Sequence, residues 1–400
     1  MTGIYLDNNA TTRVDPEVLA EMLPLFTEQF GNPSSMHGFG AAVGGKIEWA
    51  RKQVQALLGA AHDSEIVFTS GGTESDSTAI LSALEAYPKK RTVVTSVVEH
   101  PAVLALCDYL EKKRGVTVHR IPVDGKGNLD MDAYRAALSG DVAIVSIMWA
   151  NNETGTIFPI EELAVLAKAA GALFHTDAVQ AVGKIPMKLA DSAIDMLSLS
   201  GHKLHAPKGI GALYVKRGLR FRPMLRGGHQ ERSRRAGTEN APGIVGLGAA
   251  AQLALLHMQD ENTRVRALRD RLERAILAAI PNCFVTGNPD SRLPNTCNVA
   301  FEYIEGEAIL LLLNEHGIAA SSGSACTSGS LEPSHVMRAM GVPYTAAHGA
   351  TRFSLSRDTT EAEIDRVIEV LPGIIARLRA LSPYWAQGTA APKSFAPVYS

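Results

Sequence analysis

Short runs of β-branched and aliphatic residues alternate with longer amphipathic stretches over the first 215 residues of the chain. The short runs predict strands at 65–69, 92–97, 116–123, 142–149, 172–176, 196–199 and 212–215. The stretches between them have helical spacing, for example at 73–86, 101–113, 131–138 and 160–169. Strands that alternate with helices of this length are typical of βαβ units. We therefore predict an α/β fold with a mainly parallel seven-stranded sheet flanked by helices.

The pattern changes after the last of these strands. A long helical stretch from about 244 to 280 is interrupted by charged residues near 260–266. Further strands are expected at 298–301 and 353–356, and further helices at 306–316, 334–340 and 360–381. This mixture predicts a second, smaller α+β domain.

Composition narrows the class of protein. The chain has 400 residues, 46% of them hydrophobic, which is enough for a large core and too many for a disordered chain. The net charge of −2 gives no reason to expect nucleic acid or a membrane surface as a partner. We find no uncharged apolar run of membrane-spanning length and no secretory signal. The four cysteines form no C-x-x-C pair, which argues against a disulfide framework or a protein-only zinc site. These features predict a cytoplasmic enzyme.

Two polar clusters directly follow predicted strands, where ligands bind in parallel sheets. In the cluster Ser200-Gly201-His202-Lys203, the lysine can form a Schiff base with an aldehyde cofactor, and its neighbours can hold a phosphate. In the other cluster, Asp177 can keep a pyridine nitrogen protonated and Gln180 can donate to a phenolic oxygen. A surface lysine and a helix-capping aspartate are the alternative interpretations.

Three more clusters have the same position after a strand. The turn at 69–75 places Gly72 and Thr73 at the start of a helix, where backbone N–H groups bind phosphate or simply form a capped turn. His100 can stack on a planar ring or transfer protons, or it can be structural. Asn152 can touch cofactor or substrate, or stabilise a turn.

Arginines and one cysteine provide the remaining candidates. The arginine-rich segment 217–235 has few aromatic residues, so it favours an anionic ligand or a subunit contact over nucleic acid. Arg352, which we expect at the entry to a strand, can pair with a substrate carboxylate or form a structural salt bridge. Cys326 lies in a run of small residues at 320–330 that offers little apolar surface to bury it, which predicts a reactive thiol.

Together these segments resemble the cysteine desulfurases, pyridoxal-phosphate enzymes of aminotransferase fold type I, over nearly the whole chain. The most specific motifs are YLDNNATT at 5–12, SGHKLHAPKG at 200–209, GGHQER at 227–232 and SGSAC at 322–326. The sequence CTSGSLEP at 326–333 is most similar to that of the nitrogen-fixation (NifS-type) group. Two residues depart from the family pattern: Asp358 replaces an aromatic residue and Ser233 replaces a glycine.

The resemblance implies a role for each candidate. Lys203 carries the cofactor, Cys326 is the nucleophile, and His100 stacks on the ring and assists proton transfer. The implied cofactor-binding residues are Gly72, Thr73, His100, Asn152, Asp177, Gln180, Ser200, Gly201, His202, Lys203 and Thr238, the last reaching the phosphate of a partner subunit. Asn152 and Arg352 are the implied substrate-binding residues.

The resemblance also implies the reaction and the partners. Sulfur is removed from L-cysteine to give L-alanine and a persulfide on Cys326, and passes to an iron–sulfur scaffold protein, in this group for nitrogenase maturation. A homodimer is expected, as is a transient [2Fe–2S] cluster held through the Cys326 persulfide. Selenocysteine lyase, another fold-type-I aminotransferase, and a non-catalytic scaffold protein are the alternatives.

The expected domain organisation follows from the pattern and the resemblance together. The large cofactor domain covers 16–260. The small domain combines 1–15 with 261–381 and carries the cysteine loop at about 320–333. Residues 382–400 form an extended tail.

Overall fold

A seven-stranded sheet forms the centre of the molecule in the computed structural model, which describes residues 3–322, 332–383 and 385. Its order is β2-β8-β7-β6-β5-β3-β4. All pairs are parallel except those of β8, which is antiparallel to both β2 and β7. The strands are β2 (Ile66–Thr69), β3 (Thr92–Ser96), β4 (Thr117–Ile121), β5 (Val142–Ser146), β6 (Leu173–Asp177), β7 (Met196–Ser200) and β8 (Gly211–Val215). The predicted mainly parallel sheet is confirmed.

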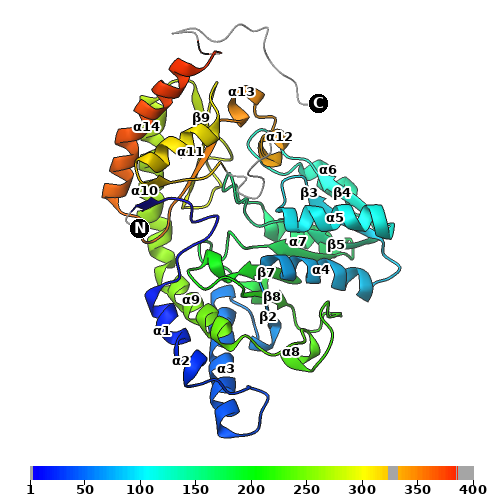
Figure 1. The fold of residues 1–400 in the computed structure, drawn as a ribbon. Helices are drawn as coiled ribbons and strands as arrows, with labels where there is room; N and C mark the ends of the chain where they lie inside the picture. Colours follow the sequence, from blue (N-terminus) through cyan, green and yellow to red (C-terminus); the bar gives the residue numbers. More distant parts are fainter. Residues whose placement is uncertain (1–2, 323–331, 384, 386–400) are drawn as a thin grey trace.

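Helices cover this sheet (Figure 1). They are α4 (Gly72–Ala86), α5 (Pro101–Arg114), α6 (Met131–Ala137) and α7 (Ile160–Ala169). The helix α5 shows how the sequence sets such bounds: the His100 side chain caps its first turn, Pro101 occupies the first helical position, and Gly115 ends it in the left-handed conformation. Short 3₁₀ turns η1 (Asp63–Glu65), η2 (Leu189–Asp191) and η3 (Gly201–Lys203) complete this region.

A second, antiparallel sheet lies in the C-terminal part of the chain, in the order β12-β10-β9. Its strands are β9 (Cys283–Val285), β10 (Thr296–Phe301) and β12 (Ala350–Ser354). The helices around it are α10 (Arg266–Ala279), α11 (Gly306–Glu315), α12 (His335–Ala339), α13 (Tyr344–Ala347) and α14 (Glu361–Leu381). The predicted strand at 353–356 is therefore displaced toward the N-terminus. As a result, Arg352 lies in the interior of a strand and not at its entry.

The first residues of the chain join this second region. The strand β1 (Ile4–Tyr5) pairs in parallel with β11 (Ile318–Ala319), and Asp7 forms an isolated bridge with Ser354. The chain then continues through α1 (Pro16–Met22), α2 (Pro24–Thr27) and α3 (Gly38–Leu58) along the lower part of the molecule. The domain boundaries expected from the sequence stay a prediction, and most of the expected tail lies outside the described residues.

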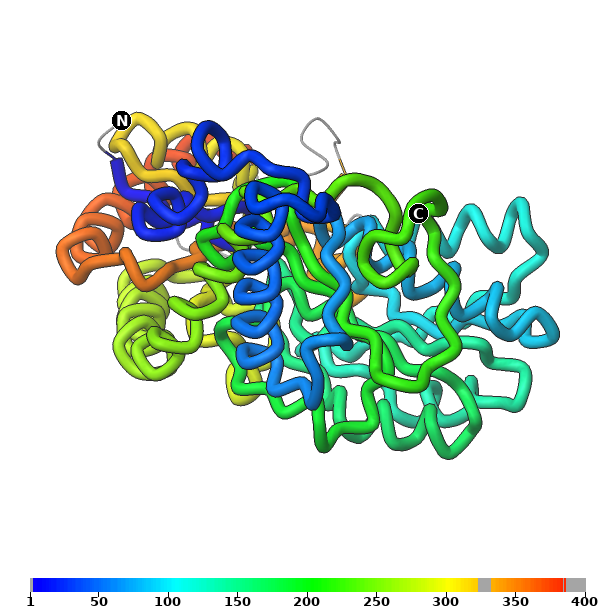
Figure 2. Tube along the Cα trace, turned by 90° about the horizontal axis from the view of Figure 1, so that it is seen from below, coloured from blue at the N-terminus to red at the C-terminus, as the bar shows by residue number. Residues whose placement is uncertain are grey.

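One long helical segment connects the two regions (Figures 1 and 2). It consists of α9 (Ala241–Asp260), the π-helical turn η4 (Glu261–Val265) and α10. The interruption predicted near 260–266 is therefore a local widening of a continuous helix. A short helical turn, α8 (Gln230–Ser233), precedes this segment.

The helix α9 is more apolar than we expected. The span Ala241–Ala279 contains a window long and apolar enough to cross a membrane, contrary to our reading of the sequence. However, 61% of that window is buried inside the protein, where α9 packs against α3 and α1. A Cβ on Gly248 would lie 2.5 Å from Ala50 Cα, so α9 and α3 are in close contact at this point. Core packing therefore accounts for the apolar character of α9.

Candidate functional site

A pocket with an empty volume of about 840 Å³ lies at the carboxyl ends of β5, β6 and β7. Because these strands are neighbours in a parallel arrangement, side chains that follow them reach the same edge of the sheet. The predicted site residues that line the pocket are Gly72, Thr73, His100, Asn152, Asp177, Gln180, Ser200, His202 and Lys203. The lining also includes Asn9, Ala10, Asp76, Met148, Ala150 and Val179.

Lys203 lies in the turn η3 directly after β7. Its Nζ donates to the backbone oxygens of Asn9, at 2.5 Å, and Ala10, at 2.6 Å. Burial, together with the nearby charges of Arg352 and Lys184, lowers the pKa of Lys203 to about 8. An amine with this pKa is partly uncharged near neutral pH, so it can act as a nucleophile or a base.

Asp177 ends β6 and faces the same pocket. Its Oδ1 accepts a hydrogen bond from Val179 N at 2.9 Å. Burial raises the pKa of Asp177, while its electrostatic interaction with the imidazole of His100 opposes this rise. Asp76 lies beside it on α4, and its Oδ1 has no hydrogen-bond partner among the described residues. Burial, followed by the charge of Asp177, raises the pKa of Asp76 well above its usual range.

The N-terminus of α4 forms a cradle for an anion. Gly71 and Gly72 lead from β2 into this fifteen-residue helix, and no side chain caps its first turn within the described part of the chain. A Cβ on Gly72 would lie 2.9 Å from Val179 Cγ2, so a side chain would not fit there. Ser200 and His202 approach from β7 and η3. Free N–H groups and a favourable helix dipole are what a phosphate group needs.

His100 contributes an uncharged imidazole. Its Nδ1 accepts a hydrogen bond from Ala102 N at 3.1 Å, which places the ring proton on Nε2. Burial lowers the pKa of His100, although the charge of Asp177 opposes this effect. Behind it, the buried Glu99 carboxyl accepts hydrogen bonds from Ser96 Oγ at 2.6 Å and Met148 N at 3.0 Å. Burial raises the pKa of Glu99 to about 8.

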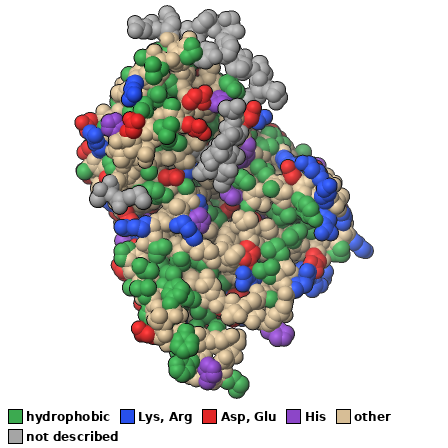
Figure 3. Space-filling model, in the orientation of Figure 1, with side chains coloured by type: hydrophobic (Ala, Val, Ile, Leu, Met, Phe, Trp, Pro, Cys, Tyr) green, Lys and Arg blue, Asp and Glu red, His purple; other side chains and the backbone are tan. Residues whose placement is uncertain are grey.

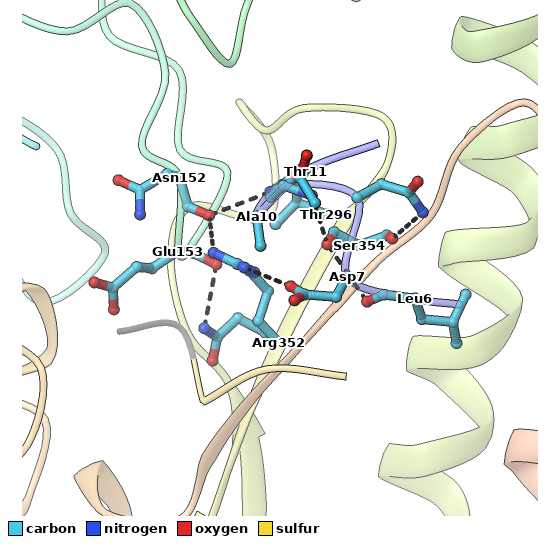
Figure 4. A network of polar contacts seen from close by, with 12 residues as sticks. Leu6, Asp7, Ala10, Thr11, Asn152, Glu153, Thr296, Arg352 and Ser354 are labelled. Atoms are coloured by element: carbon cyan, nitrogen blue, oxygen red, sulfur yellow. Dashed lines mark hydrogen bonds and ion pairs between the residues drawn. The ribbon is translucent and has the colours of Figure 1, made fainter. Parts of the chain in front are cut away.

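Arg352 lies next to the pocket and is 2% exposed. Its Nη2 pairs with Asp7 Oδ1 at 2.8 Å and its Nη1 donates to the backbone oxygen of Asn152 at 2.8 Å (Figure 4). Asn9 Nδ2 donates to the same oxygen at 3.2 Å. Arg352 is thus attached to the pocket through Asn152, and it is not among the residues lining the empty volume.

Besides Arg352, two described residues among the predicted site residues do not line this pocket. Gly201 is buried inside η3 between two residues that do. Thr238 is exposed in the segment before α9. Cys326 lies outside the described residues. The positions of Gly201 and Thr238 leave their predicted roles untested.

The arginine-rich segment mostly finds partners within the chain. Arg235 pairs with Glu74 at 2.9 Å and Arg226 with Glu85 at 2.5 Å. These contacts leave fewer arginines for an anionic ligand than we expected from the sequence. The three consecutive residues 231–233 have φ values of 49°, 56° and 63°, and the last is Ser233, where the family pattern has glycine. Glycine adopts this left-handed conformation without steric strain, which explains why the family pattern has glycine there.

The pocket contacts that we missed come mainly from the chain's first residues and from the backbone. The oxygens of Asn9 and Ala10 are main-chain groups, so no pattern of side chains in the sequence indicates them. The only available signal was the motif at 5–12. Asp76 lies one turn into α4, beyond the glycine turn that drew attention to this helix.

The donor set fits a phosphorylated aromatic aldehyde. A lysine amine, a buried carboxylate and an uncapped helix N-terminus converge on one pocket of adequate size. Gln180 Nε2 donates to Asn9 O at 3.0 Å, and its buried Oε1 has no partner among the described residues. A buried polar atom that lacks a partner is expected where a ligand completes the site.

The comparisons with known proteins agree with this geometry. The family model described as aminotransferase class-V matches residues 4–367. A cysteine desulfurase of Azospirillum brasilense is 77% identical over 399 residues, covering 100% of this chain and 99% of that protein. The cysteine desulfurase NifS of Azotobacter vinelandii is 69% identical over 402 residues and covers 100% of both chains. A solved NifS-like protein has a TM-score of 0.88 at 38% identity, covering 94% of this chain and 100% of its own.

Proposed function

The chain belongs to the class-V aminotransferase family and is a pyridoxal-phosphate-dependent cysteine desulfurase, and on this basis we propose how its residues carry out the reaction. The observation that carries the proposal is the convergence of Lys203, Asp177 and the N-terminus of α4 on one pocket. Lys203 would hold the aldehyde carbon and Asp177 the pyridine nitrogen. The first turn of α4, with Ser200 and His202, would hold the phosphate. His100 would stack on the ring, and Gln180 would contact the phenolic oxygen through its remaining N–H.

Bound pyridoxal phosphate supplies an electron sink that makes the Cα proton of an amino acid removable near neutral pH. The amine of Lys203, with its pKa lowered to about 8, is suited to take that proton. Arg352 and Asn152 are suited to orient the substrate carboxylate. Uncharged His100 can donate a hydrogen bond through the proton on Nε2.

Sulfur transfer requires a nucleophile, and we assign this role to Cys326. As a thiolate it would attack the sulfur of the bound cysteine. A sulfur–sulfur bond then forms as the carbon–sulfur bond breaks. The bonding electron pair stays with the carbon, and after that carbon gains a proton the carbon skeleton leaves as L-alanine. The support is the sequence around Cys326 and the chemistry of the other cysteines. Cys107 and Cys297 are buried, and burial raises the pKa of both.

Sulfide and alanine release from L-cysteine, in the presence of a thiol reductant, tests these assignments. Cys326→Ala should lose sulfide release and keep the absorbance of the bound cofactor, whereas Cys283→Ala should behave as wild type. Lys203→Ala should lose that absorbance. Full activity of Cys326→Ala would favour an aminotransferase, and a marked preference for selenocysteine over cysteine would favour a lyase. Protein that stays colourless after addition of pyridoxal phosphate would favour a non-catalytic scaffold.

We propose that the chain acts as a homodimer. Large apolar side chains between residues 19 and 39 are exposed and gather over α1–α3, at the lower end of the molecule in Figure 3: Leu19, Leu23, Phe26, Phe30, Met36 and Phe39. Such a patch is typical of an interaction surface. Thr238 is exposed and does not line the pocket of its own chain, so it would have to act on a partner's.

Light scattering after gel filtration tests the homodimer. The wild type should have twice the mass of one chain, and the double variant Phe26→Asp/Phe30→Asp should have the mass of one. Leu311→Asp, which changes an equally exposed residue of α11, is the matched control. A wild-type protein with the mass of a single chain would refute the proposal.

We also propose an iron–sulfur scaffold protein as the sulfur acceptor and a role in nitrogenase maturation, supported by the similarity to the NifS protein of Azotobacter vinelandii. Transfer of ³⁵S from labelled cysteine to a purified scaffold would test the first point.

The described residues contain no group of three or more potential metal ligands. The transient [2Fe–2S] cluster on Cys326 and the cytoplasmic location stay predictions.

A further inference from the structure

A second cavity, with an empty volume of about 410 Å³, shares Lys203 with the cofactor pocket. It lies where α9 meets the π-helical turn, because His257 and Glu261 form part of its lining. Lys184 lines it as well and is 8% exposed. The cavity therefore brings a second buried lysine close to the proposed catalytic one, from a segment that the proposed mechanism does not use.

The backbone around Lys184 is fixed against the turn that holds Lys203. Gly183 has a φ of +79°, and a Cβ there would lie 2.6 Å from the side chain of Leu204. The two segments are thus in direct contact one residue away from each lysine. From the π-helical turn, Asn262 Nδ2 donates to Lys184 O at 2.8 Å. These contacts leave Lys184 little freedom to move away from the site.

A chain of hydrogen bonds links the two lysine side chains. Lys184 Nζ donates to Gln180 O at 3.3 Å. Gln180 Nε2 donates to Asn9 O at 3.0 Å, and Lys203 Nζ donates to that same oxygen at 2.5 Å. Lys184 therefore supports the residue that forms one wall of the cofactor pocket and shares an acceptor with Lys203.

The charge of Lys184 is not neutralised by direct contact. Glu261 is the one carboxylate among the described residues that line the cavity, yet no ion pair of 4.0 Å or less joins it to Lys184 in the described chain, and its Oε2 has no hydrogen-bond partner there. Burial lowers the pKa of Lys184, and the charge of Glu261 opposes that effect. A buried charge without a contacting partner acts strongly on its neighbours because little water screens it.

Other charged groups also act on this pair of lysines. Arg352 adds positive charge near Lys203, and Asp7 and Asp177 add negative charge. The titratable or charged groups on the remaining elements are His205, His257 and Arg357 at the second cavity and Asp76, His100 and His202 at the cofactor pocket. They are common to all variants of Lys184, so a comparison of such variants isolates the contribution of this residue.

We propose that Lys184 is a positioning residue for the desulfurase reaction: its buried ammonium group holds Gln180 in place and disfavours positive charge on Lys203, so that a larger share of the Lys203 amine is uncharged and reactive. This inference rests on the proposed role of Lys203. A lysine placed beside a second cation in a desolvated site is a known way to activate an amine.

The titration of Lys203 itself tests the proposal. The full-length chain, freed of cofactor and checked for native circular dichroism, is treated with a trace of acetic anhydride between about pH 6 and about pH 11, which brackets the shifted and ordinary pKa values of lysine. Acetylation of Lys203 is then followed by mass spectrometry. Lys184→Met and Lys184→Gln should move the midpoint upward by roughly half a pH unit or more. Lys184→Arg should leave it near the wild-type value, as should Lys188→Met, which changes an exposed lysine of the same segment.

Unchanged midpoints in the two neutral variants would overturn the proposal, even if both variants lost thermal stability. An upward movement in Lys184→Arg equal to that in Lys184→Met would overturn it too, since charge would then not be the cause. In the holoenzyme, the pH midpoint of the cofactor's absorbance should move upward in the same two variants. Cofactor absorbance that survives Lys203→Ala would refute the role proposed for Lys203, while the acetylation result would still report on the coupling between the two lysines.

Discussion

Arg352 and Asp7 form an ion pair of 2.8 Å across 345 positions of the sequence. The pair fixes the N-terminal segment to the strand β12 at the edge of the cofactor pocket. Lys203 holds the same segment from the other side, through the backbone oxygens of Asn9 and Ala10. The first residues of the chain thus connect the proposed substrate arginine to the proposed catalytic lysine.

Arg352→Lys should weaken the binding of L-cysteine. Lysine keeps the charge but lacks the planar, forked guanidinium group of arginine. It therefore cannot contact Asp7, Asn152 and a substrate carboxylate at the same time. The loss of one charge-assisted hydrogen bond predicts a rise in KM of roughly 10- to 100-fold, with a smaller fall in kcat. Steady-state kinetics of alanine formation measure both. An unchanged KM would mean that Arg352 serves structure alone.

Asp177→Asn should keep the cofactor and lose most of the turnover. An amide retains the contact with Val179 N but cannot stabilise a protonated ring nitrogen, so we expect kcat to fall by about 100-fold or more. Cofactor content by absorbance and turnover are measured on the same sample. Asp191→Asn, in the turn η2, is the control and should match wild type. Equal turnover in both variants would argue against contact between Asp177 and the ring.

Glu99→Gln should make stability less dependent on pH. The folded state raises the pKa of Glu99 to about 8. The stability linked to its neutral form is therefore fully present below the ordinary pKa of glutamate and is lost as pH rises through about 8. Wild type should therefore lose more stability than Glu99→Gln between about pH 5.5 and about pH 8.5. Urea unfolding at the two pH values measures this, with the surface variant Glu162→Gln as control. A larger loss of stability in Glu99→Gln than in wild type would show that Glu99 is ionised in the folded protein.

Glu231→Gln should destabilise the fold strongly. Arg51 and Glu231 form a two-pronged ion pair of 2.6 and 2.8 Å with side chains only 8% and 4% exposed. Removing the carboxylate leaves a buried guanidinium without a counter-charge, at a cost of about 3–5 kcal/mol. Glu85→Gln breaks the exposed pair with Arg226 and should cost less than about 1 kcal/mol. Similar urea midpoints for the two variants would contradict this difference.

Much of the pocket could be predicted because it follows a rule of topology. Lys203 and Gly72 follow a strand and Asp177 ends one, and the strand ends of a parallel sheet share one edge. The alternation of apolar and polar runs located those strands. The same reasoning placed Arg352 wrongly, at a strand entry, because the run Ala350–Ser354 contains Thr and Arg at buried positions and reads as polar.

Other contacts had no local signal. Lys184 and Glu261 are charged residues that sequence alone places on the surface, and only the packing of α9 against the turn after β6 buries them. The π-helical turn has the same origin, since its residues look like any charged helix. Such features depend on which segments meet in space, and that information is spread over the whole chain.

The two acceptors of Lys203 have one more consequence, which concerns mutational scanning. Both are main-chain carbonyl oxygens, and every amino acid at position 10 supplies the same oxygen. Replacing Ala10 by another residue will therefore leave that contact in place, and a complete side-chain scan will score the position by the size of its substituent alone. A backbone amide-to-ester replacement at this peptide unit, which weakens the carbonyl acceptor, is the change that will reveal it.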